Sequence, residues 1–322
     1  MMKKNKPIII AEACQNHKGD LKILKEMIAA AKEAGADIIK IQSMLAAELT
    51  KRDRFEEGLM EKGQVKVIKR PYQVEYERLK SMDLNDEAHR WFVDECYRVG
   101  IQPMTTVFSL SRIPFLASLK WKAIKVASYD CASIPLIKEL MKHFEHLYIS
   151  TGATYDHEIE ETAEVLKGHS FTFLHCVTIY PTPLNEIHLR RMDWLRQFTP
   201  TVGFSDHSLV ARDGIKASLA ALYYGAHVIE RHLTILKPDQ TKDGPISVNP
   251  LQLQEIVEFS KLSKSEQEKY IQEYVPEYSQ MLGKAQRPLS HQEELNRDYY
   301  RGRFAMQKDG EVIYNWEERS IR

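Results

Sequence analysis

One βαβ motif decides the fold, and it reads TVGFSDHS at 201–208, ARDGIKASLAALYYGA at 211–226 and VIERHLT at 228–234. Both outer runs are short and β-rich, and each ends abruptly in polar residues, while the middle run has the composition of a helix. Two adjacent parallel strands joined by a crossover helix would bring both polar ends to the same edge of a sheet. The motif therefore predicts that His207 and His232 lie side by side at that edge.

Neighbouring imidazoles at strand ends suit a shared metal ion. The alternative is that neither histidine binds a metal. One would then cap a helix, and the other would be buried in the core with its hydrogen bonds formed. Two histidines on consecutive units, each beside charged residues, favour the metal site over this alternative. Zinc commonly takes three or four protein ligands, whereas only His207 and His232 are secure ligands here. The pattern therefore favours Mn²⁺, with Mg²⁺ or Co²⁺ as alternatives.

Short β-type runs alternate with amphipathic helical runs along most of the chain. The predicted strands occupy residues 7–13, 36–42, 101–108, 122–128, 146–151, 170–177, 199–205 and 226–232. They carry many consecutive apolar residues, as parallel strands buried on both faces do. Eight strand–helix units predict an α/β fold, a (β/α)₈ TIM barrel over residues 1–262.

Two segments depart from this alternation. Residues 43–85 are irregular and highly charged, which predicts a long insertion with the role of a lid. Residues 263–322 form a short polar C-terminal extension, predicted as a helix over 263–282, a linker and a hairpin-like piece with its turn at 308–310. The final piece, at about 35 residues, is too short for a core of its own. We therefore expect it to pack on the barrel or on a partner subunit.

Composition excludes several classes of function. The chain has 322 residues and a formal net charge of zero, so no basic excess points to nucleic acid. No apolar run reaches the roughly 20 residues of a membrane helix. The apolar run after the basic start is short and is followed directly by Glu12, which indicates a strand rather than a signal peptide. The four cysteines lack CxxC spacing and suit reduced thiols, which predicts a cytoplasmic protein.

Polar residues at the carboxyl ends of barrel strands line the active-site face, and Lys40 and Lys125 are the most unusual of them. A lysine in an apolar strand is costly to bury unless it is paired. Both would lie near strand-end hydroxyls, and ammonium and hydroxyl groups together suit a phosphate. The alternatives are that each lysine reaches solvent at its strand end, or that one of them forms a Schiff base.

A metal, a phosphate pocket and one carboxylate fit an aldol-type addition. The metal would polarise a carbonyl as a Lewis acid, and Glu12, at the end of the first strand, would move a proton. Gln42, at the end of the second strand, is a further candidate for contact with the substrate.

Seven motifs, in order, are similar to those of the sialic acid synthase family, and they cover residues 7–262. They are IIIAEACQNHKGD, GADIIKIQ, IKVAS, ISTGAT, HCVTIYPTP, GFSDHS and VIERHLT. Members of this family condense phosphoenolpyruvate with an N-acylated amino sugar. The resemblance implies a transferase in which C3 of phosphoenolpyruvate attacks the sugar aldehyde, water adds at C2 and phosphate leaves. It also implies a homodimer.

The resemblance implies residue roles as well. Glu12 matches the catalytic carboxylate, and His207 and His232 match the metal ligands, usually written with Mn²⁺. The residues that match positions around phosphoenolpyruvate are Lys40, Thr106, Lys125, Ser128, Ser150 and Ser205. On the sugar side Tyr180 matches a family position, and Thr178 and Asp243 are further candidates for contact with the sugar.

The departures from the family gather on the sugar side. Thr178 stands where the family usually has Asn. The Asp of the family's GPD-type run is replaced by Asp239, by Asp243 or by neither. The family's antifreeze-like domain is represented only by the remnant RDYYRGRFAMQKDGEVI at 297–313. We therefore expect an unusual acceptor sugar, and a separate antifreeze-like protein is a candidate partner.

Other functions fit parts of this pattern. A related phosphoenolpyruvate-dependent sugar-acid synthase and a metal-dependent pyruvate aldolase are the enzymatic alternatives, and release of phosphate separates a synthase from an aldolase. A weakened barrel that binds a sugar or assembles with a partner is the alternative from another class. A pure binding module would not need Glu12, the two histidines and both lysines.

Overall fold

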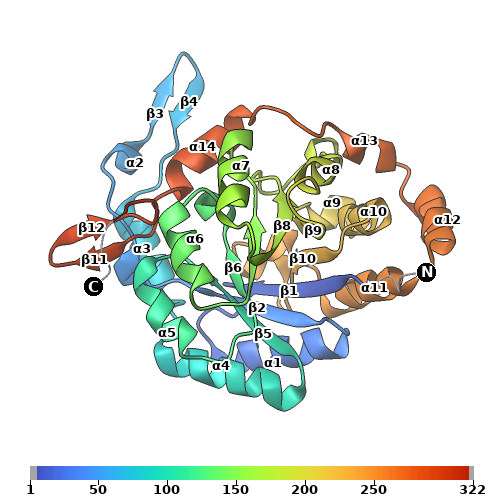
Figure 1. Cartoon of the computed structure of the whole chain (residues 1–322), viewed down its shortest axis with the longest axis horizontal. Helices are drawn as coiled ribbons and strands as arrows, with labels where there is room; N and C mark the ends of the chain where they lie inside the picture. The colour runs from blue at the N-terminus through green and yellow to red at the C-terminus, as the bar shows by residue number, and fades with distance from the viewer. Residues whose placement is uncertain (1–5, 319–322) are drawn as a thin grey trace.

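Eight parallel strands close into a barrel at the centre of the molecule (Figure 1). The computed structural model describes residues 6–318. The barrel strands are β1 (Ile8–Cys14), β2 (Ile38–Ser43), β5 (Gln102–Val107), β6 (Ile124–Val126), β7 (His146–Ser150), β8 (Ser170–Cys176), β9 (Val202–Asp206) and β10 (Val228–His232). Pairing of β1 with both β2 and β10 closes the ring. The predicted (β/α)₈ barrel is therefore confirmed.

Strand register brings polar residues from distant parts of the chain to one level of the barrel. Glu12 on β1 lies opposite both Lys40 on β2 and His232 on β10. Thr106 on β5 lies opposite Lys125 on β6. Because all the strands are parallel, their carboxyl ends open on the same face, and these polar side chains gather there.

The helices that follow the barrel strands surround the barrel (Figure 1). They are α1 (Leu21–Glu33), α4 (Asp86–Val99), α5 (Ile113–Ala117), α6 (Ile134–Met141), α7 (Asp156–Val165), α8 (Arg191–Leu195), α9 (Val210–Asp213), α10 (Lys216–Tyr224) and α11 (Pro250–Lys261). Capping sets their ends: the Asp20 side chain accepts a hydrogen bond of 2.7 Å from the backbone nitrogen of Lys22, and α4 ends at Gly100 in the left-handed conformation. One large apolar cluster fills the layer between strands and helices.

A smaller apolar cluster of strand residues, among them Ile10, Met104 and Leu174, is separate from that layer. Ile10 lies two positions before Glu12 on β1, so it points to the same side of the strand, into the barrel. The cluster fills the barrel interior below the polar level. It therefore leaves the carboxyl face as the open end.

Two runs with the composition of a helix are interrupted. Residues 185–198 contain a 3₁₀ turn, η4 (Leu184–Glu186), followed by α8, and His188 between them has a φ of +54°. The run at 211–226 divides into α9 and α10 at Gly214, whose φ of +57° no right-handed helix contains. No helix within residues 6–318 has the length and apolar character needed to cross a membrane.

The insertion at 43–85 is ordered, so the prediction that it is irregular is wrong. It contains η1 (Ala46–Glu48), α2 (Arg54–Glu57), a hairpin of β3 (Leu59–Glu61) and β4 (Gln64–Val67), and α3 (Tyr72–Lys80). Figure 1 shows the hairpin projecting from the body of the molecule. Few of its hairpin residues are buried, which is why the sequence lacks an apolar alternation there.

In its described part, up to residue 318, the C-terminal extension contains three helices and a hairpin. They are α12 (Lys264–Tyr274), α13 (Tyr278–Leu282), α14 (His291–Tyr300), β11 (Met306–Lys308) and β12 (Glu311–Ile313). The helix predicted over 263–282 is divided because Pro276 cannot continue α12. The hairpin forms at the predicted position, with Asp309 and Gly310 at positive φ in its turn. Helix α14 lies in the stretch that the sequence predicts as a linker.

Candidate active site

A cavity of about 660 Å³ opens at the carboxyl ends of the barrel strands. Every predicted site residue except Thr178 lines it: Glu12, Lys40, Gln42, Thr106, Lys125, Ser128, Ser150, Tyr180, Ser205, His207, His232 and Asp243. All eight strands, or the loops directly after them, contribute to this lining. The fold thus brings the predicted residues together, while their individual roles remain predictions.

Lys40 is held on the cavity floor by two partners. Its Nζ donates a hydrogen bond of 2.7 Å to Oγ1 of Thr106 and forms an ion pair with Glu12. Burial lowers the pKa of Lys40 to about 7, a shift that Glu230 opposes and Lys125 reinforces. An anion that binds beside this amine would favour its charged form.

Lys125 and Glu230 complete a charged cluster with Lys40. Nζ of Lys125 donates a hydrogen bond of 2.6 Å to Oγ of Ser150, and Oε1 of Glu230 accepts one of 2.9 Å from Oγ of Ser205. Oε2 of Glu230 lies 4.0 Å from Nζ of Lys40 and 3.9 Å from Nζ of Lys125. Burial raises the pKa of Glu230, but the two ammonium groups, the hydrogen bond from Ser205 and the nearby His232 together lower it overall.

Glu230 belongs to the polar strand ends expected at the active-site face, but no role was predicted for it. The signal for it was present, because Glu230 lies two positions before His232 and side chains alternate along a strand. Asp206 and Arg231 belong to the same polar strand ends, which the sequence places at one edge of the sheet, but they do not face the mouth. Both are fully buried and form an ion pair of 2.7 Å with each other. They point to the opposite side of their strands and do not line the cavity.

The two predicted metal ligands lie next to each other. The ring centroids of His207 and His232 are 5.2 Å apart, with an angle of 62° between the rings. Burial is the main cause that lowers the pKa of both imidazoles. Each ring is therefore neutral near neutral pH, which is the form that binds metals.

His232 also belongs to a cluster of three different metal-binding side chains. One ring nitrogen of His232, Sγ of Cys14 and a carboxylate oxygen of Asp243 all lie within 4.8 Å of one another. Nδ1 of His232 is buried and has no hydrogen-bond partner among residues 6–318, which is uncommon for a buried ring nitrogen. Imidazole, carboxylate and thiol are all ligands of divalent metals, so these residues fit a metal ion.

The predicted sugar-side residues occupy different depths. The ring of Tyr180 packs edge-on against His207, with centroids 4.5 Å apart. Thr178 is buried behind the cavity wall, and its Oγ1 has no hydrogen-bond partner in the described part of the chain. Of the two alternatives for the acidic residue, Asp243 lines the cavity, whereas Asp239 is exposed and does not.

Helix α14 forms part of the cavity wall, which the sequence reasoning missed. Gln292, Asn296, Tyr300 and Arg303, on α14 or just after it, line the cavity. Nδ2 of Asn296 donates a hydrogen bond of 2.6 Å to the carbonyl of Thr178. The sequence of this segment is mostly polar and has no apolar face that would indicate a buried helix. Its position at the cavity is therefore seen only in the structure.

Aromatic and charged contacts continue this wall across the mouth. The Tyr300 ring stacks on Tyr129 at a centroid distance of 4.9 Å. The guanidinium of Arg303 forms an ion pair with Glu75 of α3, in the insertion. The C-terminal extension and the insertion therefore meet at the rim of the same cavity.

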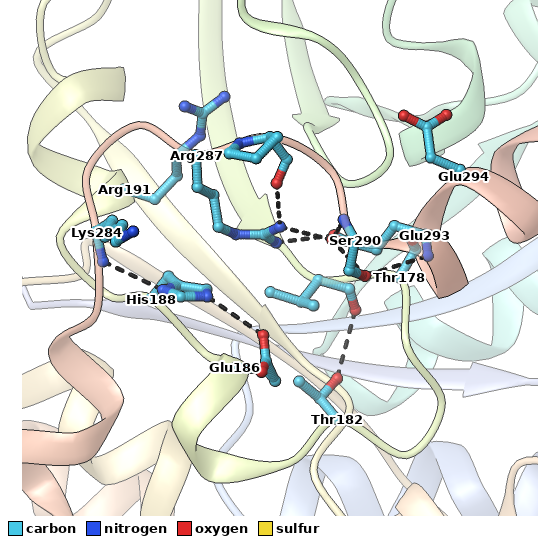
Figure 2. A network of polar contacts seen from close by, with 12 residues as sticks. Thr178, Thr182, Glu186, His188, Arg191, Lys284, Arg287, Ser290, Glu293 and Glu294 are labelled. Atoms are coloured by element: carbon cyan, nitrogen blue, oxygen red, sulfur yellow. Dashed lines mark hydrogen bonds and ion pairs between the residues drawn. The ribbon is translucent and has the colours of Figure 1, made fainter.

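A network of polar contacts holds the segment before α14 in place (Figure 2). Arg287 forms a two-point ion pair with Glu293, with nitrogen–oxygen distances of 2.6 and 2.8 Å. Glu293 also accepts a hydrogen bond from the backbone nitrogen of Ser290, as part of the capping box that begins the helix. Nδ1 of His188 accepts a hydrogen bond of 3.1 Å from the backbone nitrogen of Lys284. The contact of Lys284 with His188 joins the extension to the segment that follows β8.

The fold and the cavity define a class of protein. A (β/α)₈ barrel with two buried lysines, buried carboxylates and clustered metal-binding side chains at its carboxyl face is an enzyme for an anionic substrate. Within that class, the chain belongs to the NeuB family, whose model matches residues 27–270. The family membership predicted from the seven sequence motifs is confirmed.

Known relatives agree with this membership. The chain is 34% identical over 262 residues to the N,N'-diacetyllegionaminic acid synthase of Campylobacter jejuni, covering 77% of this chain and 73% of the relative. The structure is similar to that of the spore coat polysaccharide biosynthesis protein SpsE from Bacillus subtilis, with a TM-score of 0.71, 27% identity and coverage of 92% and 78%. It is also similar to the N-acetylneuraminic acid synthetase of Leptospira borgpetersenii in complex with citrate, with a TM-score of 0.69, 25% identity and coverage of 92% and 91%.

Proposed function

We propose that the protein is a phosphoenolpyruvate-dependent nonulosonate synthase, a transferase that condenses phosphoenolpyruvate with an N-acylated amino sugar and releases phosphate. The observation that carries this proposal is the pair of buried lysines, Lys40 and Lys125, beside two neighbouring imidazoles in one cavity. Membership of the NeuB family and the sugar-acid synthases among the relatives support the same reaction.

Phosphoenolpyruvate binds on the cavity floor in this proposal. Lys40 and Lys125 contact its phosphate and carboxylate, because ammonium groups form strong, charge-assisted hydrogen bonds with such oxygens. Hydroxyl groups complete the site, and those that line the cavity floor belong to Thr106, Ser128, Ser150 and Ser205. Glu230, between the lysines, keeps both ammonium groups on the floor before substrate arrives.

His207 and His232 hold a divalent metal, with Mn²⁺ as the predicted ion and Mg²⁺ or Co²⁺ as alternatives. When bound, the ion supplies Lewis-acid polarisation of the acceptor's aldehyde. The two neutral rings suit this role because a protonated imidazole cannot bind a cation.

Glu12 moves the proton in the proposed reaction. A bond forms between C3 of phosphoenolpyruvate and the aldehyde carbon, and the aldehyde oxygen takes up a proton to become a hydroxyl. Water adds at C2 and gives up a proton to the Glu12 carboxylate, which passes a proton on to the aldehyde oxygen. The bond between C2 and the phosphate oxygen then breaks, the remaining proton of the water goes to the phosphate, and a ketone and inorganic phosphate are left. The carboxylate of Glu12 is buried beside Lys40, within the same cavity as both reactants in this scheme.

The acceptor sugar occupies the side of the cavity lined by Tyr180, Asp243 and α14. Asn296 and Gln292 offer amide groups there, and Tyr300 offers an aromatic face. These groups suit the hydroxyl and acylamino substituents of an amino sugar. A homodimer and a separate antifreeze-like partner are further predictions of the family resemblance, as is a cytoplasmic location.

A phosphate-release screen tests the proposal. The full-length protein is incubated with phosphoenolpyruvate and a panel of hexosamine-derived aldehydes, with and without Mn²⁺. We expect phosphate release that depends on both an acceptor and the metal. The Glu12→Gln variant should retain binding of both substrates and lose about 10²- to 10⁴-fold in turnover. Carbon–carbon bond formation from pyruvate without phosphate release would instead identify an aldolase.

A further inference from the structure

Cys14 occupies a position that its backbone conformation disfavours. It ends β1 with a φ of +47°, in the left-handed region that a residue with a Cβ rarely adopts and that glycine adopts freely. The side chain is nevertheless buried at the mouth of the cavity and lines it. The conformation therefore aims a thiol at the cavity where glycine would be the easiest residue to place.

The neighbours of this thiol are metal-binding groups. Sγ of Cys14 donates a hydrogen bond of 2.9 Å to Oδ2 of Asp243. A ring nitrogen of His232 lies within 4.8 Å of both groups. His232 is only 7% exposed, and its Nδ1 has no hydrogen-bond partner within residues 6–318. A buried imidazole with an unsatisfied nitrogen beside a thiol and a carboxylate is an arrangement that a cation would complete.

We infer that Cys14 is a ligand of the metal proposed for this site, bound through its thiolate, with Asp243 as a carboxylate ligand on the same side. The inference rests on the proposed metal site and deepens it, because it adds a sulfur donor to the two imidazoles. On binding, the S–H bond of Cys14 breaks, the proton leaves to solvent and the sulfur electron pair binds the cation.

A sulfur ligand changes which cations the site prefers. Thiolates bind softer ions such as Co²⁺ and Zn²⁺ better than Mn²⁺ or Mg²⁺, which favour oxygen ligands. Removal of the sulfur should therefore weaken Co²⁺ binding more than Mn²⁺ binding. This difference separates a ligand role for Cys14 from a purely structural one.

The test uses the full-length protein, freed of metal by chelation and titrated with Co²⁺ alone. Calorimetry measures the affinity, and absorption measures the sulfur-to-cobalt charge-transfer band in the near ultraviolet. The informative variant is Cys14→Gly, because glycine fits the φ of Cys14 and should fold at least as well. Cys14→Ser is a second variant that keeps a polar group of similar size. Neither readout requires catalytic activity.

Two other cysteines provide controls. Cys176 also lines the cavity, and its Sγ lies 3.8 Å from Nδ1 of His207. Cys96 lies in the apolar core and does not line the cavity. Cys176→Ala separates the two thiols at the site, and Cys96→Ala controls for the loss of any buried thiol.

We expect the charge-transfer band in the wild type and in both control variants, and its loss in both Cys14 variants. Loss of Cys14 should also weaken Co²⁺ binding by at least about tenfold, the lower bound for removing even an outer-shell partner of a metal ligand. Mn²⁺ affinity should fall less. Bound Co²⁺ without the band in the wild type, or a band that disappears in Cys176→Ala instead, would overturn the assignment. Failure to bind Co²⁺ at all would overturn the underlying metal site as well.

Discussion

At the scale of single residues, alternation along the last barrel strands separates two kinds of charged group. Glu230 and His232 face the cavity, while Arg231 between them is buried in an ion pair with Asp206 on the far side of the strands. The triplets SDH and ERH at the ends of neighbouring strands predict that polar groups meet there, but not which of those groups face the cavity. A period of two, counted from the histidines, would have made that distinction and would have added Glu230 to the predicted site.

Lys125 offers a direct test of the phosphoenolpyruvate side. Replacing it in Lys125→Ala removes a charged hydrogen-bond donor, and such bonds contribute about 1.5–3 kcal/mol. We expect KM for phosphoenolpyruvate to rise about 10- to 100-fold, with little change in KM for the acceptor. Lys122→Ala, at the exposed opposite end of the same strand region, is the matched control. Equal effects on both substrates would argue against a phosphate contact.

Lys40 should make phosphoenolpyruvate capture depend on pH. Its pKa is lowered to about 7 by burial, so the amine is charged below that pH and neutral above it. Only the charged form attracts an anion. We therefore expect kcat/KM for phosphoenolpyruvate, which reports the free enzyme, to fall above pH 7 by about tenfold per pH unit.

Lys40→Arg provides the control for this dependence, because arginine stays charged across the range. Its activity should be lower, since Arg does not reproduce the contacts of Lys40 with Thr106 and Glu12, but the fall above pH 7 should disappear. A wild-type profile that stays flat to pH 9 would contradict a charged Lys40 as the group that attracts the substrate.

At the scale of elements, the barrel was predictable and the cavity wall was not. Buried parallel strands have an apolar composition that stands out from the helices between them, so each strand was found. Helix α14 buries few side chains, and polar contacts with the barrel, such as the ion pair of Arg297 with Glu158, hold it in place. Contacts of this kind join residues that are distant in the sequence to loops of the barrel, and no local pattern encodes them.

The positions at which helices are interrupted also could not be predicted from the sequence. His188 adopts positive φ within a run that reads as one helix, and its ring accepts a hydrogen bond from Lys284, almost a hundred positions along the chain. Tertiary contact thus overrides a local helical preference. The sequence could supply the number and type of the barrel elements, but not where such contacts interrupt them.

Asn296 tests whether α14 takes part in acceptor binding. The Asn296→Ala variant removes an amide from the cavity wall, and a neutral hydrogen bond is worth about 0.5–1.5 kcal/mol. We expect KM for the acceptor to rise about 2- to 10-fold while KM for phosphoenolpyruvate stays unchanged. Steady-state kinetics with each substrate varied in turn measures this difference.

Ser290→Ala is the control for helix position. It removes the capping side chain of α14 without touching the cavity, at a cost of about 1 kcal/mol in stability. If Ser290→Ala raised KM for the acceptor as much as Asn296→Ala does, Asn296 would act by positioning the helix and not by contact with the sugar.

At the scale of the whole molecule, the proposed metal should stabilise the fold. The candidate ligands come from β1, from the ends of β9 and β10 and from the loop after β10, and pairing of β1 with β10 closes the barrel. A metal at about 100 times its Kd adds about 2.7 kcal/mol to the free energy of unfolding. We expect chelation to lower Tm by about 5 °C in a thermal scan.

The double variant His207→Ala with His232→Ala should lack this Tm shift and still unfold cooperatively. A wild-type protein whose Tm is the same with chelator and with added Mn²⁺ would count against a metal held by the barrel's closing strands.

The charges on the cavity floor have a consequence for how the two ligands bind. Lys40 and Lys125 are already matched by Glu12 and Glu230, and the neutral imidazoles add no charge. Phosphoenolpyruvate therefore brings an excess of negative charge into a neutral, buried setting, and a cation beside it would offset that excess. Phosphoenolpyruvate and the metal should each tighten the binding of the other by the same factor, typically about 5- to 150-fold. Isotherms for phosphoenolpyruvate with and without Mn²⁺ would reveal this reciprocity, and identical affinities would show that the two ligands are independent.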